Sequence, residues 1–91
     1  MSERKKSEII HFQSECLVEY SKYAKITTME SSELFKKYNL FEFISECYDV
    51  LHLDSVEYVV KYDIAKRIKE QIVFNQIKIN MLTGIKWLAS V

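Results

Sequence analysis

SVEYVVKYDIAKRIKE, residues 55–70, is the stretch that decides the fold class of this chain. Its first half, VEYVVKY, is rich in β-branched and aromatic residues and alternates as a strand would. Its apolar residues nevertheless recur every four positions, at Val56, Val60, Ile64 and Ile68. That pattern runs unbroken into IAKRIKE and is typical of the buried face of an amphipathic helix. The stretch therefore predicts a helix rather than a strand.

The rest of the chain carries the same helical signal. It has 91 residues with one glycine and no proline, whereas a sandwich or barrel usually builds its many tight turns from both residues. Apolar residues spaced three and four apart predict further helices near residues 7–24, 31–38 and 41–51. We therefore expect one domain over residues 1–91 with an all-α fold, a compact bundle of four to five short helices.

Polar residues mark the ends of the second predicted helix. Thr27 followed three residues later by Glu30 fits a capping box, and Ser31 or Ser32 offers a later start. Asn39 tolerates the left-handed backbone conformation that ends many helices. The sequence therefore predicts a stop at Asn39 and leaves the start open.

Residues 47–58, CYDVLHLDSVEY, place one histidine among several acids. The candidates for a catalytic or metal-binding cluster are Asp49, His52, Asp54 and Glu57. No HxxxH, HExxH or CxxC spacing supports a metal, and no glycine-bearing turn offers an oxyanion hole. A helix–connection–helix junction explains the same residues, with His52 bonding the last carbonyls of one helix and Asp54 or Ser55 capping the next. We expect a structural junction made by Tyr48, Asp49, His52 and Asp54, with no catalytic, cofactor or metal site.

Residues 72–91 are apolar over more than one face. Ile77, Met81, Ile85 and Leu88 form a helical stripe, but IVFNQIKIN also fits a strand, so the element type stays open. The segment either packs back on the domain or binds a partner. Because monomers seldom expose large apolar patches, we expect a homodimer joined across a two-fold axis, or a chain stable only with its cognate partner. The candidate partner-binding residues are Tyr58, Tyr62, Ile77, Met81, Ile85, Trp87 and Leu88.

Charge and targeting signals exclude several function classes. Lys+Arg and Asp+Glu each number 13, which gives a net charge of zero. The bases within residues 61–69 could contact phosphate in a DNA-binding regulator, yet the predicted recognition helix over residues 41–51 carries three acids, so nucleic-acid binding is not expected. The N-terminus has no secretory signal and no stretch is apolar enough to span a membrane, which favours a cytoplasmic protein.

Residues 33–68, ELFKKYNLFEFISECYDVLHLDSVEYVVKYDIAKRI, resemble a small bacterial family, the domain of unknown function thirty-seven ninety-one. The residues that carry the resemblance are Leu34, Phe35 and Tyr38; Tyr48, Asp49, Leu51 and His52; Glu57, Tyr58, Val59 and Val60; and Asp63 and Ile64. The similarity covers residues 8–70 and leaves residues 71–91 as a C-terminal extension. The resemblance implies an accessory or antitoxin-like protein, because members are often encoded beside a protein with an ADP-ribosyltransferase-like fold.

These observations lead to one main hypothesis and two alternatives. The main hypothesis is a small non-enzymatic module that binds another protein, such as the product of a neighbouring gene. The first alternative is a transcriptional regulator of the helix-turn-helix type. The second is a metal-dependent enzyme that uses the cluster around His52.

Overall fold

A computed structural model describes the backbone of residues 3–89 and the side chains of residues 3–82. Within that range every regular element is helical, which confirms the all-α class. The elements are α1 (Glu3–Ala24), α2 (Thr28–Lys37), α3 (Leu40–Glu46), α4 (Tyr48–Leu51), α5 (Val56–Tyr58), the π-helix η1 (Val59–Ile64) and α6 (Ala65–Ala89). The last three follow one another without a break, so the stretch that decided the fold class is helical throughout.

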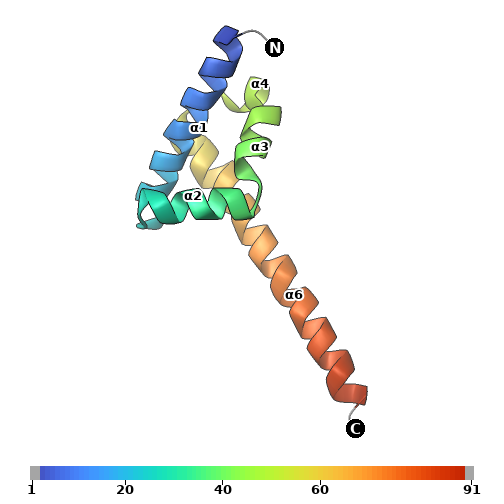
Figure 1. Ribbon diagram of the computed structural model, residues 1–91. Helices are drawn as coiled ribbons and strands as arrows, with labels where there is room; N and C mark the ends of the chain where they lie inside the picture. The colour runs from blue at the N-terminus through green and yellow to red at the C-terminus, as the bar shows by residue number, and fades with distance from the viewer. Residues whose placement is uncertain (1–2, 90–91) are drawn as a thin grey trace.

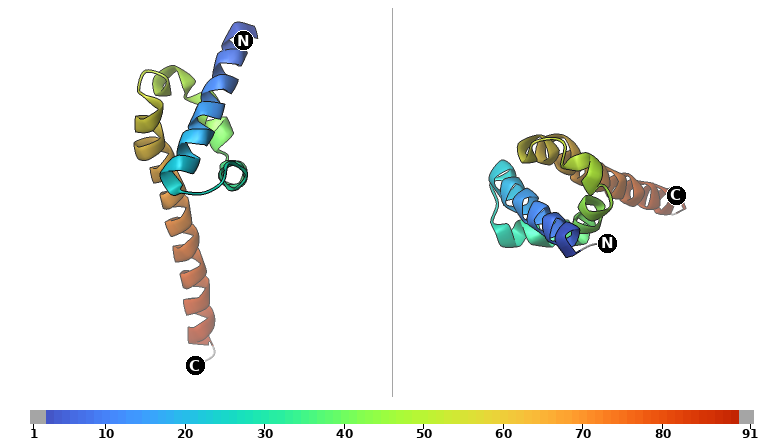
Figure 2. Two further views of the ribbon diagram at one scale, coloured as in Figure 1. Left: turned by 90° about the vertical axis from the view of Figure 1, so that its left-hand side faces the viewer. Right: turned by 90° about the horizontal axis from the view of Figure 1, so that it is seen from above.

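The molecule consists of a compact head and a projecting helix (Figures 1 and 2). The head comprises α1 to η1 and the first turn of α6. The rest of α6 runs away from it as a rod. The radius of gyration is 16.8 Å and the extents are 61 × 30 × 21 Å, whereas a compact domain of this length has a radius of gyration of about 12 Å. The bundle is therefore compact only in its head, and its last helix is long rather than short.

The core lies inside the head, between α1 on one side and α2, α3 and the α5–η1–α6 segment on the other. Its members are apolar side chains from α1, α2, α3, α4, η1 and the start of α6: Phe12, Cys16, Tyr20, Phe35, Leu40, Ile44, Leu51, Val59, Val60, Ile64 and Ile68. Phe35 is fully buried and its ring lies 5.7 Å from that of Tyr20 and 5.3 Å from that of Phe41. No core residue lies beyond Ile68 among the described side chains, so the head closes there.

The capping box starts α2 earlier than the predicted range. Thr27 Oγ1 accepts from the backbone N–H of Glu30 at 3.1 Å, and the Glu30 carboxylate accepts from the backbone N–H of Thr27 at 3.2 Å. Ser31 is not a cap. It is fully buried, and its hydroxyl donates to the carbonyl oxygen of Leu17 at 3.2 Å, which ties α2 to α1. Of the starts that the sequence left open, the Thr27 cap is therefore confirmed, and α2 begins three residues before the expected range of 31–38.

Two residues with a left-handed backbone end the first two helices. Lys25 follows α1 with φ 57°, and Asn39 follows α2 with φ 56°. Asn39 confirms the predicted stop. The predicted helix over residues 41–51 is broken instead of continuous, because Cys47, with φ −101° and ψ 12°, separates α3 from α4.

The π-helix η1 follows from the spacing of apolar residues in residues 55–70, where they recur every four positions. In an α-helix, side chains four positions apart drift by about 40° around the axis at each step. A π-turn bonds residue i to i+5 and so holds more residues per turn, which reverses that drift. The backbone N–H of Ala65 donates to the carbonyl oxygen of Val60, as a π-turn requires. Val60 and Ile64 consequently both stay in the core, at 1% and 0% exposure.

Candidate functional site

The junction around His52 is built from local structural contacts. Asp49 lies at the surface of α4, where its Oδ1 accepts from Nζ of Lys5 in α1 at 2.8 Å. The Lys5 ammonium lowers the pKa of Asp49, first through this hydrogen bond and then through its charge. The His52 Nδ1 lies 2.7 Å from the carbonyl oxygen of Tyr48, and the two rings stack with centroids 4.6 Å apart. These contacts agree with a junction made by Tyr48, Asp49 and His52.

The cap of the next helix is Ser55 rather than Asp54. Ser55 Oγ accepts from the backbone N–H of Tyr58 at 3.2 Å, and its backbone is extended. Glu57 lies in the first turn of α5, where a negative charge faces the positive end of the helix. Among the described side chains, residues 3–82, no three of His, Cys, Asp or Glu form a group that could hold a metal ion.

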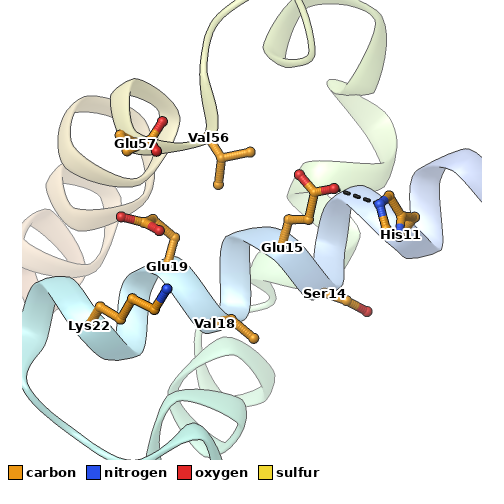
Figure 3. A pocket seen from close by; sticks show the side chains of 8 residues that line it. All are labelled: His11, Ser14, Glu15, Val18, Glu19, Lys22, Val56 and Glu57. Atoms are coloured by element: carbon orange, nitrogen blue, oxygen red, sulfur yellow. Dashed lines mark ion pairs between the residues drawn. The ribbon is translucent and has the colours of Figure 1, made fainter.

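A groove that the sequence did not predict lies between α1 and α5 (Figure 3). It has a volume of about 440 Å³ and is lined by His11, Ser14, Glu15, Val18, Glu19, Lys22, Val56 and Glu57. Val56 and Glu57 face Glu15 and Glu19 across it. The spacing of apolar residues in α1 places its glutamates on the solvent-exposed side of the helix. Nothing in the sequence indicates that α5 lies beside them.

Two polar side chains that line this groove are engaged within their own helix, α1. His11 Nε2 lies 2.6 Å from Oε1 of Glu15, a pair that is ionic only when the imidazole is protonated. The hydroxyl of Ser14 donates to the carbonyl oxygen of Ile10 at 3.0 Å, so it is held within its own helix and is not paired with a base. The groove therefore lacks the nucleophile–base pair that nucleophilic catalysis uses.

Two of the predicted partner-binding residues lie together on the head. Tyr58 is 48% exposed and Tyr62 is 50% exposed, and their ring centroids are 4.7 Å apart. The Lys61 ammonium lies 5.3 Å from the centroid of Tyr62. The Arg67 guanidinium lies 4.2 Å from the ring centroid of Phe43. Two of the bases in residues 61–69 are thus held against aromatic rings.

The other predicted residues belong to the projecting part of α6. Ile77 and Met81 are 51% and 61% exposed. Ile85, Trp87 and Leu88 lie outside the described side chains. The exposed apolar side chains between residues 72 and 82 are Ile72, Val73, Phe74, Ile77, Ile79, Met81 and Leu82. Over these residues the segment does not pack back on the head, so that alternative is wrong for the described part, while partner binding stays a prediction.

Six of the seven exposed apolar side chains of this rod fall into two stripes, and Leu82 lies between them. The first, here called the inline stripe, consists of Ile72 and Ile79, which lie one turn and three turns beyond the buried Ile68 and so continue the core-facing side of the helix. The second, here called the opposite stripe, lies about 180° away around the axis. Its members are Val73, Phe74, Ile77 and Met81. Shallow apolar depressions of about 400 and 300 Å³ run along the opposite stripe.

No helix among the described residues is long and apolar enough to cross a membrane. No curated protein and no solved structure matches the chain. The family described as "Protein of unknown function (DUF3791)" matches residues 11–71, which span most of the head from α1 to the start of the projecting rod. On this match the chain belongs to that family.

Proposed function

We propose that this chain is a non-enzymatic protein-binding module and that its binding element is the projecting part of α6. The observation that supports this is the run of seven apolar side chains between residues 72 and 82, each about half exposed or more. Soluble monomers seldom expose contiguous apolar patches of more than a few hundred Å². A helix that carries such side chains on two opposite sides offers surface to more than one neighbour.

The inline stripe suits a partner that extends the core of the head. Ile64 and Ile68 are buried against α1 and the other helices, at 0% and 4% exposure. Ile72, one turn later on the same side, is 50% exposed because the head ends there. A partner helix or apolar surface laid beside Ile72 and Ile79 would continue that packing, and each side chain so buried contributes up to about 2 kcal/mol.

Two partners fit this helix: a second copy of the chain, in a homodimer, and a different protein that covers the inline stripe. For the different protein, the first candidate is the product of a neighbouring gene, toward which this chain would act as an accessory or antitoxin-like protein in the cytoplasm. The ring contacts of Lys61 and Arg67 count against the DNA-binding alternative, since both bases are partly engaged on the head.

Co-expression with the tagged neighbouring-gene product tests the second partner. Ile79→Glu places a charge in the inline stripe, and Ile77→Glu makes the same change on the opposite stripe at nearly the same exposure. We expect the wild type and Ile77→Glu to be retained with the product, and retention of Ile79→Glu to fall at least about 10-fold. Equal retention of both variants, or no retention of the wild type, would contradict a role of the inline stripe in binding this product.

A further inference from the structure

We infer that the π-helix η1 is a conformational device that holds one residue more than its helix needs, and that this surplus residue keeps both ends of η1 facing the core. The surplus lies between Val60 and Ile64, which are buried, among the three residues that lie outside the core: Lys61, Tyr62 and Asp63. The inference goes beyond the proposed function, because it concerns the helix itself and holds for any partner that the rod binds.

Buried side chains fix the orientation of this helix at both ends of η1. Val59 and Val60 are buried where η1 begins, Ile64 is buried where it ends, and Ile68 is buried one turn later in α6. All four belong to the single core of the head. They must therefore lie close together around the helix axis.

A regular α-helix would not bring these four side chains together. It turns by about 100° per residue, so Ile64 would lie about 40° and Ile68 about 80° past Val60. Val59 lies about 100° on the other side of Val60, and the four would spread over about 180°. The bond from the N–H of Ala65 to the carbonyl oxygen of Val60 spans five residues instead of four. One extra residue sets Ile68 back by about 100°, to about 20° from Val60 on the side of Val59, so the buried arc narrows to about 100°.

An α-helix that lacks one residue between Val60 and Ile64 reaches the same arrangement. Ile64 would then follow Val60 by three positions and would lie about 60° from it, on the side of Val59. Ile68 would again lie about 20° from Val60. This helix can therefore lose one residue inside η1 and keep its core-facing side, which a regular helix cannot do.

Deletion of Lys61 tests the surplus. Its side chain is exposed, and its ammonium lies 5.3 Å from the ring centroid of the adjacent Tyr62. The matched control for the lost side chain is Lys61→Ala, which keeps the helix at full length. We expect the deletion variant to melt within about 5 °C of Lys61→Ala, with an equally helical circular dichroism spectrum.

Deletion of Ser14 is the control for a regular helix. Ser14 is exposed, bonds within its own helix and stands in α1 between the core residues Phe12 and Cys16. Its removal turns Cys16 by about 100° relative to Phe12 and should lower the melting temperature by at least about 15 °C. Equal melting temperatures of the two deletion variants, whether both are high or both are low, overturn the inference.

Ile68→Ala tests whether the deletion of Lys61 keeps α6 facing the core. In the full-length chain this substitution should lower the melting temperature by at least about 10 °C, because Ile68 is buried. We expect the same loss in the chain that lacks Lys61. Ile72→Ala, at an exposed position one turn later, should shift either chain by less than about 3 °C. If Ile68→Ala has no effect once Lys61 is deleted, α6 has turned away from the core and the inference is overturned.

Discussion

The Nζ atom of Lys5 lies 2.8 Å from Oδ1 of Asp49, so an ion pair joins the first turn of α1 to α4. The hydrogen bond and the opposite charge raise the pKa of Lys5 and lower that of Asp49. Both side chains are exposed to solvent, Lys5 at 41% and Asp49 at 74%. The pair therefore fixes the position of α4 more than it adds stability, because exposed ion pairs contribute little.

The first prediction concerns the pH dependence of this pair. Because folding lowers the pKa of Asp49 below its ordinary value of 3.8, the contribution of Asp49 is complete above that value and disappears as the pH falls through the lowered pKa. Because folding raises the pKa of Lys5 above 10.5, the contribution of Lys5 disappears only as the pH rises through the raised value. Asp49→Asn should melt slightly below the wild type at neutral pH. The two melting curves should converge in acid and in high salt, and a gap that persists in acid would refute the assignment.

The second prediction separates Ser55 from Asp54 as the cap of α5. Ser55→Ala should lower the free energy of unfolding by about 1 kcal/mol, since it removes the oxygen that accepts from the N–H of Tyr58. Asp54→Ala, one position earlier, should change it by less than about 0.5 kcal/mol. Urea unfolding followed by circular dichroism measures both. A larger loss for Asp54→Ala would restore the cap that the sequence also allowed.

Local signals predicted local structure well. The Thr27–Glu30 capping box and the left-handed Asn39 are visible in the sequence because each depends on side chains within one helical turn. The start of α2 was misplaced because Ser31, which also suits a cap, is used for a bond to Leu17 fourteen positions away. The break at Cys47 could not be predicted, because no glycine or proline lies there. The three-four spacing of apolar residues continues across Cys47 and therefore predicted one continuous helix.

The third prediction concerns Lys25, the residue that ends α1 with φ 57°. Any residue with a Cβ atom is held in this conformation at a cost of about 1–2 kcal/mol, which glycine does not incur. Lys25→Gly should therefore stabilise the protein by about 0.5–1 kcal/mol after the greater chain entropy of glycine is subtracted. Lys22→Gly, in the last turn of α1, is the matched control and should destabilise by a similar amount. A loss of stability in both variants would mean that the Lys25 side chain contributes more than its backbone costs.

The candidate surfaces were only partly predictable. The apolar excess of residues 72–91 is evident in the sequence, and the structure keeps Ile77 and Met81 exposed as expected. The division of these residues into two stripes cannot be predicted from the sequence, because it depends on which side of α6 faces the core. The π-turns of η1 rotate that side away from the position that a regular α-helix would give it. The α1–α5 groove depends on contacts between distant segments and has no signal of its own.

The last prediction is that the projecting rod is dispensable for folding. Ile68 is the last buried side chain among those described, and every described residue from Lys69 to Leu82 is exposed. A chain that stops after Gln71 therefore keeps the whole core, including Ile64 and Ile68. It should show a helical circular dichroism spectrum and should melt within a few degrees of the full chain at concentrations where the full chain is dissociated. It should be monomeric in light scattering at every concentration, since it lacks both stripes. A truncated chain that fails to fold would show that the rod stabilises the head through contacts absent from this structure, whereas one that still dimerises would place self-association on the head.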